Sequence, residues 1–531
     1  MKHISILLIA IAALVNTACD SSLPSYEHLH GKPSGGTENS GNGGNDEGKP
    51  GGESTPGIPS FGFEVSPTGS GAYTDDVLTL TFSNVPVLGK DGRIVIFNSD
   101  GSQADMIDMS DVSATFEQMT NTSLHRTTID FLGAPSLKRY RAVNYQPVRV
   151  EGNSVVIKPH SNRLEYGKTY YITIDRTAII AEGFSGITAE KKWEFATKQE
   201  PSSKESVTVA KSGNSDFRTV QGAIDWAYKC GPDRPMLINI GKGVFEEQLF
   251  IRNNNKLIFK GESREETIIQ YANAEEYANG VGGSITSIPA LGESIGKSGG
   301  RSVILMEICK GIRFEDMTLR NTYGKPGQAE VIYNNSDGNY TLSFVNCSLT
   351  SLQDTFNSKG YGWMKDCLVE GDCDFIWGSP RTWLFEDCEI RAAGDGYIVQ
   401  SRCMDSKYKG FVFLNCRLTK TTGTTDGTMY LARSSGSKDY YDNVAFINCR
   451  MSSVIHSKGW FDNPAPNPEK ADATSGWKEY GSKDLSGAAL STGGRYSGAH
   501  MLTMEEYEST YKDRAAIFAD CPAGTDWLDM K

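Results

Sequence analysis

Asp366-Cys367-Leu368-Val369 and Asp387-Cys388-Glu389-Ile390 are two copies of one short pattern that recurs along the chain. The pattern is an acidic or amide residue, then Cys or Met, then any residue and an aliphatic one. The other copies are Asp316-Met317-Thr318-Leu319, Asn346-Cys347-Ser348-Leu349, Asn415-Cys416-Arg417-Leu418 and Asn448-Cys449-Arg450-Met451. Successive copies lie 30, 20, 21, 28 and 33 residues apart. Such a strand-like repeat with variable insertions indicates a solenoid, most simply an all-β, right-handed parallel β-helix.

The second position of this pattern holds five of the chain's 11 cysteines. Cysteines of exported proteins often form disulfides. Here, residues one coil apart stand above one another, so we expect a buried ladder of free thiols inside the coil. The alternative is a disulfide between Cys373 and Cys403, or one that uses Cys230.

Two carboxylates, Asp354 and Asp374, lie 20 residues apart in apolar, β-forming sequence, where an unpaired charge is costly. Neighbouring strands of a sheet are about 4.8 Å apart, so residues separated by one coil are close in space. Gln328 precedes Gln353 by 25 residues, which is another coil. The repeat therefore predicts a column of Gln328, Gln353 with Asp354, and Asp374 on one face.

This column suits ester hydrolysis. Two close carboxylates do not ionise together easily, so one stays charged and the other protonated. The charged one can attack an ester carbonyl, and the protonated one can donate to the leaving alkoxide and later take a proton from water. Two amides can stabilise the oxyanion, and an arginine can hold the nucleophile ionised. The seven histidines lie outside these stretches, which speaks against a Ser-His-Asp site. The cysteines lack zinc spacing, so no metal is expected.

Motifs along residues 205–531 resemble those of pectin methylesterases of the β-helix type. They include Gly243-Val244-Phe245-Glu246-Glu247, Gln328-Ala329, Gln353-Asp354-Thr355 and Asp374-Phe375-Ile376-Trp377-Gly378, followed by Gly459-Trp460 near the carboxyl terminus. The resemblance implies hydrolysis of the methyl esters of galacturonate units in pectin, without a cofactor.

The resemblance also implies a role for each matched residue. Asp374 would be the nucleophile and Asp354 the general acid and base. The oxyanion donors would be Gln328 and Gln353, and Arg433 would pair with the nucleophile. The substrate-binding aromatic residues would be Trp377 and Phe245.

Two departures from the family pattern leave alternatives open. Ser434-Ser435 replaces the family's Pro-Trp after the arginine, and Gly371-Asp372-Cys373 replaces its Gly-Thr-Val. One alternative is an esterase of the same fold that acts on acetylated sugars or acyl thioesters. Others are a calcium-dependent pectate lyase and a pectin-binding surface protein without activity. Asp372 beside Asp374 also leaves a calcium site open.

The amino terminus reads as an export signal. Residues 1–18 combine Lys2, a short apolar run and a small-residue exit, and Cys19 follows directly. This resembles a bacterial lipoprotein signal, so we expect a lipid on Cys19, a tether at 19–60 rich in Gly, Ser and Pro, and an outer-membrane or cell-surface location. Plain secretion after cleavage at Ala18 is the alternative. The net charge of -12 speaks against nucleic acid as a partner. We expect a monomer.

Residues 61–198 contain short alternating runs separated by turn residues, such as Thr169-Tyr170-Tyr171-Ile172-Thr173-Ile174 and Trp193-Glu194-Phe195-Ala196. This pattern predicts an antiparallel β-sandwich. The segment resembles the bacterial immunoglobulin-like domains that serve as spacers in secreted proteins. It has no cluster of catalytic residue types, so we expect it to present its neighbour or to bind sugar weakly.

Overall fold

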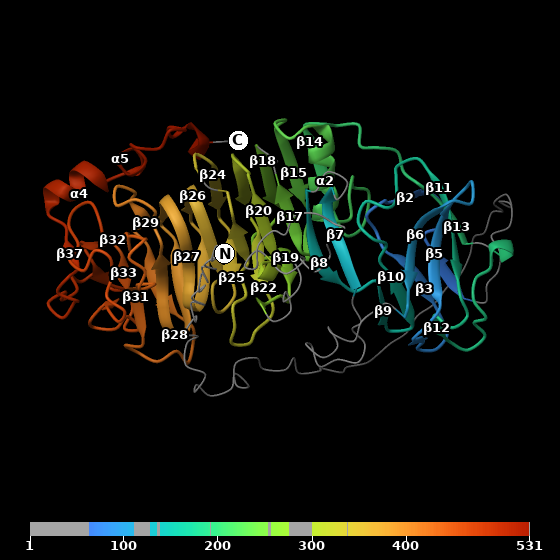
Figure 1. Cartoon of the computed structure of the whole chain (residues 1–531), viewed down its shortest axis with the longest axis horizontal. Coiled ribbons are helices and arrows are strands. Elements are labelled where there is room, and N and C mark those ends of the chain that lie inside the picture. Colours follow the sequence, from blue (N-terminus) through green and yellow to red (C-terminus); the bar gives the residue numbers. More distant parts are fainter. Residues whose placement is uncertain are drawn as a thin grey trace, which may run out of the picture.

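The computed structural model describes residues 63–110, 128–134, 139–191, 193–252, 256–275, 300–336 and 338–529. The predicted signal, Cys19 and the predicted tether lie outside these residues. Strands dominate both parts of the molecule, a sandwich and a long coil of strands that lie end to end in Figure 1.

The amino-terminal unit is built from two main sheets. The first has the order β1 (Glu64–Ser66), β3 (Leu78–Thr81), β10 (Ser154–Ile157), β9 (Val148–Glu151). The second has the order β2 (Gly69–Ala72), β13 (Trp193–Thr197), β11 (Thr169–Ile174), β5 (Arg93–Asn98), β6 (Gln103–Asp108). A short pair joins β4 (Val87–Leu88) to β12 (Ile179–Ile180), and η2 spans Ala189–Lys191.

Alternation of apolar and polar residues explains how these sheets pack. Along β11, Tyr170, Ile172 and Ile174 are buried and the residues between them are half-buried. They share one core with residues of both sheets, including Leu80 and Trp193. The runs predicted as strands at 169–174 and 193–196 are confirmed. The kinship of this sandwich with immunoglobulin-like domains stays a prediction.

One hairpin departs from the sandwich. Strands β7 (Thr128–Ala134) and β8 (Arg139–Tyr145) pair with each other and pack on a strand of the coil, β17 (Leu249–Arg252). Figure 1 shows them between the two units. The amino-terminal unit therefore reaches onto the coil, which the sequence pattern did not reveal.

Within the described residues, the coil contains 24 strands, and the strands of its successive turns pair in parallel. This is the parallel β-helix that the repeat predicted. Besides β17, its strands are β14 (Ser206–Val209), β15 (Met236–Ile240), β16 (Gly243–Glu246), β18 (Leu257–Gly261), β19 (Thr267–Tyr271), β20 (Ile304–Glu307), β21 (Ile312–Glu315), β22 (Thr318–Asn321), β23 (Ile332–Asn334), β24 (Thr341–Val345), β25 (Ser348–Thr350), β26 (Phe356–Lys365), β27 (Leu368–Glu386), β28 (Glu389–Ser401), β29 (Gly410–Leu414), β30 (Arg417–Lys420), β31 (Met429–Arg433), β32 (Val444–Ile447), β33 (Arg450–Met451), β34 (Trp460–Phe461), β35 (Trp477–Tyr480), β36 (Lys483–Asp484) and β37 (His500–Met501).

The coil has three faces, and the third is the one that matters for the site. It is formed by β17, β20, β23, the first part of β26, the middle of β27, the end of β28, β31 and β34. We call this the third face.

The repeat marks one corner of the coil. Its first residue has a positive φ in every copy, between 51° at Asn346 and 58° at Asn415. Asp and Asn tolerate this left-handed conformation better than other residues with a side chain, which explains their recurrence. The next residue then points inward, so that Cys or Met is buried in every copy. A backbone requirement therefore underlies the pattern that predicted the fold.

Stacked side chains fill the coil. Cys347, Cys367, Cys388, Cys416 and Cys449 are buried free thiols, as predicted. The alternative disulfides are wrong, because Cys230 and Cys403 are also free thiols. Aromatic rings stack in the same way: the centroids of Phe385 and Phe413 are 4.7 Å apart, and those of Phe413 and Phe446 are 4.4 Å apart.

Helix α2 (Val220–Cys230) closes the end of the coil nearest to the sandwich. Asp75 of the sandwich accepts hydrogen bonds from the backbone N–H groups of Arg218 and Thr219, at 2.9 and 2.7 Å. Thr219 is the N-cap of α2, and Glu247 accepts from the next two backbone N–H groups. These carboxylates stabilise the positive end of the helix.

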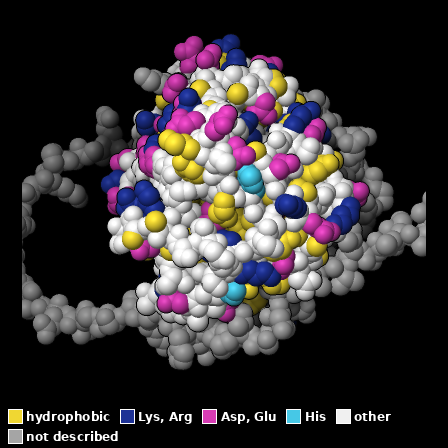
Figure 2. All heavy atoms as spheres, turned by 90° about the vertical axis from the view of Figure 1, so that its left-hand side faces the viewer, with side chains coloured by type: hydrophobic (Ala, Val, Ile, Leu, Met, Phe, Trp, Pro, Cys, Tyr) yellow, Lys and Arg dark blue, Asp and Glu magenta, His cyan; other side chains and the backbone are white. Residues whose placement is uncertain are grey.

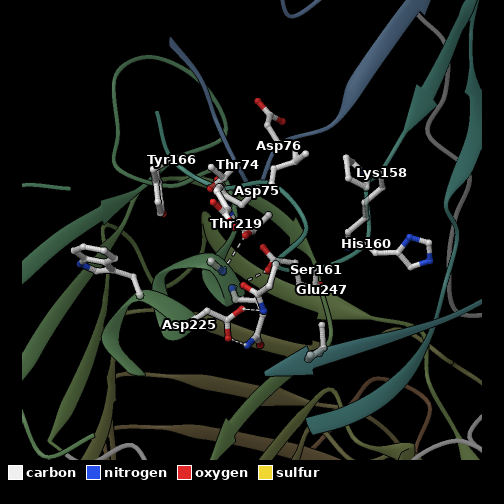
Figure 3. Close-up of a pocket in the computed structure, with 18 of the residues that line it drawn as sticks. Thr74, Asp75, Asp76, Lys158, His160, Ser161, Tyr166, Thr219, Asp225 and Glu247 are labelled. Atoms are coloured by element: carbon white, nitrogen blue, oxygen red, sulfur yellow. Dashed lines mark hydrogen bonds between the residues drawn. The ribbon is translucent and has the colours of Figure 1, made fainter. Parts of the chain in front are cut away.

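Beside these contacts lies a pocket of about 350 Å³ between the two units, lined among others by Asp75, Tyr166, Asp225 and Trp226. Figure 3 shows Asp75 and Thr219 facing each other at this pocket. Because Asp75 and Thr219 belong to different units, their contact fixes the sandwich against the coil.

The far end of the coil carries α4 (Met504–Thr510), α5 (Arg514–Ile517) and η5 (Asp526–Asp529). Figure 2 shows this end of the molecule, where acidic and basic side chains are interspersed. Across the residues that the structure describes, no helix combines the length and the apolar character needed to cross a membrane.

Candidate active site

The predicted column forms where the chain enters the third face. Gln328 and Gln353 pair as a parallel bridge just before β23 and β26. In the next coil, β26 and β27 pair residues 20 positions apart, as in Phe356 with Ile376. The backbone N–H of Asp354 donates to the carbonyl of Cys373 at 3.0 Å. Asp354 therefore lies beside the residue that precedes Asp374.

Both carboxylates sit on unusual backbone. Asp354 has φ of 65° and Asp374 has φ of 47°, and each side chain is only 5% exposed. A positive φ is uncommon outside glycine and frequent at functional sites. The two residues thus share residue type, conformation and burial.

Asp374 is held by an arginine and an amide. The Nε of Arg433 donates to both carboxylate oxygens of Asp374, at 2.8 and 3.0 Å, and its Nη2 also donates to Oδ2. Nε2 of Gln400 donates to the same Oδ2 at 3.1 Å. Charge-assisted bonds of this kind favour an ionised carboxylate.

A second arginine orients that amide. Nη2 of Arg402 donates to Oε1 of Gln400, which leaves the amide N–H group of Gln400 facing Asp374. Burial alone would lower the pKa of Arg433, but its hydrogen bond and attraction to Asp374 raise it overall. The nucleophile candidate is therefore surrounded by donors that stay charged or are fixed in place.

Asp354 has a different environment. Its Oδ2 lies 3.2 Å from Nη2 of Arg301. Arg301 is itself shared, because its Nε donates to both oxygens of Glu330 at 2.7 and 2.8 Å, and its Nη1 pairs with Glu275. Asp354 thus competes for one cation with two other carboxylates.

Burial raises the pKa of Asp354 well above its ordinary value, with Arg301 opposing this shift and the charges of Glu330 and Asp374 adding to it. Burial also raises the pKa of Glu330 to about 7, against the pull of Arg301. Burial and these charges therefore favour the protonated form of Asp354, which can donate a proton.

Arg301 also contacts Gln328. Its Nη1 donates to Oε1 of Gln328, so the amide N–H group of Gln328 remains available for a substrate oxygen. Gln328 and Gln353 are both half-buried at the start of the third face. This arrangement suits them to donate to an oxyanion.

Trp377 lies between the two arginines. Its ring centroid is 5.6 Å from the guanidinium of Arg301 and 5.2 Å from that of Arg402. Tyr333 meets it edge-on at 6.1 Å. The residue is 8% exposed. Its contact with substrate stays a prediction.

Phe245 was predicted to bind substrate, and its position contradicts this. It is fully buried in the core of the coil, on β16, where Lys211 covers the ring at 4.9 Å. The aromatic residue of this motif packs inward because β16 alternates between exposed and buried positions, and Phe245 falls on the buried side.

The two departures from the family pattern adjoin Arg433 and Asp374 along the chain. Ser434, at the position of the family's proline, is buried and donates to Asp442 at 2.8 Å. Burial raises the pKa of Asp372 to about 6. Within the described ranges, no group of three or more His, Cys, Asp or Glu side chains could hold a metal ion.

Four site residues escaped the sequence analysis: Arg301, Glu330, Gln400 and Arg402. A signal for them existed in the coil period. Gln400 pairs with Trp377 one coil earlier, and Arg301 precedes Gln328 by 27 residues. Each is a polar residue at the edge of an apolar run, where burial demands a partner.

The chain is similar to known pectinesterases. Residues 206–519 match the family model for pectinesterase. Pectinesterase 31 of Arabidopsis thaliana is 30% identical over 266 residues, which cover 48% of this chain and 76% of the relative. Probable pectinesterase A of Aspergillus fumigatus is 27% identical over 327 residues, covering 61% and 88%. Pectin methylesterase PemA from Erwinia chrysanthemi, a solved structure, aligns with a TM-score of 0.46 and 25% identity, covering 59% and 97%.

The family match spans more than half of the chain and contains every predicted catalytic residue. The sandwich lies outside the matched residues. The predicted fold class and the predicted ester hydrolase are confirmed, and the chain belongs to the pectinesterase family.

Proposed function

We propose that this protein hydrolyses methyl esters of galacturonate units in pectin, with Asp374 as the nucleophile and Asp354 as the general acid and base. The observation that carries the assignment is the contrast between the two carboxylates. Asp374 receives bonds from Arg433 and Gln400, whereas Asp354 shares Arg301 with Glu330. Hydrogen-bond donors surround the oxygens of Asp374, whereas burial favours the protonated form of Asp354.

The reaction then follows in two halves. An oxygen of Asp374 attacks the ester carbonyl carbon, and the resulting oxyanion accepts hydrogen bonds from Gln328 and Gln353. As the intermediate collapses, Asp354 gives its proton to the departing methoxide, which leaves as methanol. A mixed anhydride between the substrate carbonyl and Asp374 remains.

Water completes the cycle. Asp354, now ionised, takes a proton from a water molecule that attacks the anhydride. Asp374 leaves as a carboxylate, and the galacturonate carboxylate is released. The proton taken by Asp354 restores its starting state.

The test is methanol release from highly methylated pectin in the presence of a chelator, with the parent compared with Asp374→Ala and Asp354→Ala. We expect release by the parent and near-complete loss in both variants, about 10⁴-fold or more, since each removes a reacting group. A folded parent that releases no methanol would refute pectin methyl ester as the substrate. Acetylated sugars and acyl thioesters would then be the next substrates to assay.

We further propose that the enzyme acts outside the cytoplasm, anchored by a lipid on Cys19. The support is the signal-like segment at 1–18 and the tether that follows it. Labelling with a radioactive fatty acid in a bacterial host should mark the parent and not Cys19→Ala. Equal labelling of the two would contradict the anchor.

A further inference from the structure

The β7–β8 hairpin of the amino-terminal unit brings a buried arginine to the coil backbone beside Arg301. Arg141 is completely buried. Its Nη1 donates to the carbonyls of Leu249 and Val303, at 2.7 and 3.0 Å. Its Nη2 donates to the carbonyl of Gly300 at 3.2 Å and to that of Ser302. A residue of one unit thus binds the backbone of the other.

The carbonyls bound by Nη2 flank Arg301. Gly300 precedes it and Ser302 follows it, so Arg141 binds the Gly300–Arg301 peptide unit and the Ser302–Val303 peptide unit. Asn273 donates to the same two carbonyls, at 2.8 and 3.0 Å. Because the backbone direction sets where a side chain points, these bonds aim Arg301 at its partners.

Apolar contacts hold the hairpin in place. Leu132 and Val143 of the hairpin form one buried cluster with Phe250 and Leu305 of the third face. Tyr333 packs against this cluster and meets Trp377 at 6.1 Å. The hairpin is therefore connected to the active site in two ways, by the hydrogen bonds of Arg141 next to Arg301 and by this apolar cluster next to Trp377.

We propose that Arg141 is a positioning residue: it fixes Arg301, and through Arg301 the general acid Asp354, so that the amino-terminal unit completes the active site. This inference rests on the proposed function. It assigns a catalytic contribution to a unit that lies outside the residues matched by the pectinesterase family, 206–519. On this basis the sandwich is more than a spacer.

The burial of Arg141 fits such a specific role. Burial lowers its pKa to about 9, partly offset by Tyr271, Glu307 and Glu330. A buried guanidinium is costly unless its donors are satisfied. Four backbone carbonyls of the coil offset part of this cost by accepting from Nη1 and Nη2, while Nε has no hydrogen-bond partner among the described residues. Two of these carbonyls flank Arg301, which links the position of the hairpin to the geometry of the site.

The full chain with Arg141→Met is compared with Asp75→Ala. Both changes remove a polar contact between the units, but Asp75 binds at α2, away from Arg301. We expect both variants to unfold at lower temperature. Only Arg141→Met should lose kcat, by about tenfold, with KM within about twofold, because positioning acts on the chemical step.

The pH profile gives a readout that a merely structural role would not move. Asp354 faces Arg301, Glu330, Asp374 and Arg402. If Arg301 is no longer held against Asp354, the carboxyl loses its nearest cation and keeps its proton to higher pH. The basic limb of kcat/KM in Arg141→Met should shift upward, that of Asp75→Ala should not, and Arg141→Lys should recover part of the parent's profile.

Hydrogen exchange provides the same test without activity. Exchange in the segment 300–305 should be faster in Arg141→Met than in the parent, and unchanged in Asp75→Ala. If Arg141→Met does not fold, Arg141→Lys is measured in its place. Parental kcat, pH profile and exchange in a folded variant would overturn the proposal, as would an equal loss of kcat in Asp75→Ala. A parent that releases no methanol overturns the proposed function instead, and exchange still decides whether Arg141 fixes this segment.

Discussion

Asp354 and Asp374 are the same residue type, one coil apart, equally buried and both at positive φ, yet their surroundings differ. Asp374 faces the side of the coil that carries Arg433 and Gln400, and it receives several donors. Asp354 faces the side that carries Arg301 and Glu330, where one cation serves three carboxylates. The difference between them comes from the neighbouring coils.

This contrast teaches how a β-helix makes two roles from one residue. Neighbouring coils lie about 4.8 Å apart, so each carboxylate meets the side chains of the coil on its open side. Donors on one side favour the anion, and competing carboxylates on the other favour the proton. Substitutions around Asp374 and substitutions around Asp354 should therefore have different effects on kcat and on its pH dependence.

Among changes to the partners of the two carboxylates, the largest loss of kcat is expected on the side of the nucleophile, Asp374. Arg433→Lys should lower kcat by about 100-fold, because lysine cannot donate to both oxygens of Asp374 from a planar fork. Methanol release under saturating substrate measures it. Arg391→Lys is the matched control, since Arg391 pairs with Glu370 and Glu389 on another face and its side chain is 32% exposed. A kcat of Arg433→Lys within twofold of the parent would show that bidentate binding does not matter here.

A smaller effect, with a defined sign, is expected from the acid side. Glu330→Gln removes a negative charge that helps keep Asp354 protonated. The pKa of Asp354 should fall, so the basic limb of kcat/KM should move to lower pH. At alkaline pH the variant should be about tenfold less active than the parent. The measurement is the pH dependence of methanol release.

Glu275→Gln is the control for this change. Glu275 also pairs with Arg301, but its side chain is 52% exposed while that of Glu330 is fully buried. Solvent screens an exposed charge, so Glu275→Gln should leave the pH profile nearly unchanged. Equal shifts in the two variants would contradict the role given to the buried pair.

The sequence predicted the coil because its signal repeats. Asp366 and Asp387 mark the same corner with the same backbone need, and Cys367 and Cys388 follow them inward. It predicted Asp354 and Asp374 for the same reason, because one coil separates them. Periodicity converts sequence distance into spatial distance wherever the insertions are short.

The coil period alone could not identify the arginines around the two carboxylates, for a physical reason. Arg301 is recognisable only from its partners Glu330 and Gln328, which lie in the next coil. Arg141 reaches the site from another unit, across more than 150 residues of chain. The prediction that Phe245 binds substrate was wrong because a family motif indicates only the residue type. The register of β16 decides which side of the coil the residue faces.

The smallest effect is expected where one donor among several is removed. Gln400→Leu removes the hydrogen bond from the side-chain amide to Asp374, while Arg433 still donates to both carboxylate oxygens. One net hydrogen bond is worth about 1 kcal/mol, so kcat should fall about fivefold. Gln270→Leu is the control, because Gln270 also donates to a carboxylate, Glu246, but at an exposed site at 2.9 Å.

This last change decides whether the donors on Asp374 act separately. If Arg402 and Gln400 only orient the amide, Arg402→Lys in the Gln400→Leu background should cost little more, because Arg402 would act through an amide that is no longer there. A further large loss in the double variant would mean that Arg402 has its own contact in the reaction. Arg402 would then act on several groups at once, as Arg301 does beside Asp354. The surroundings of the two carboxylates would in that case differ less than their hydrogen bonds indicate.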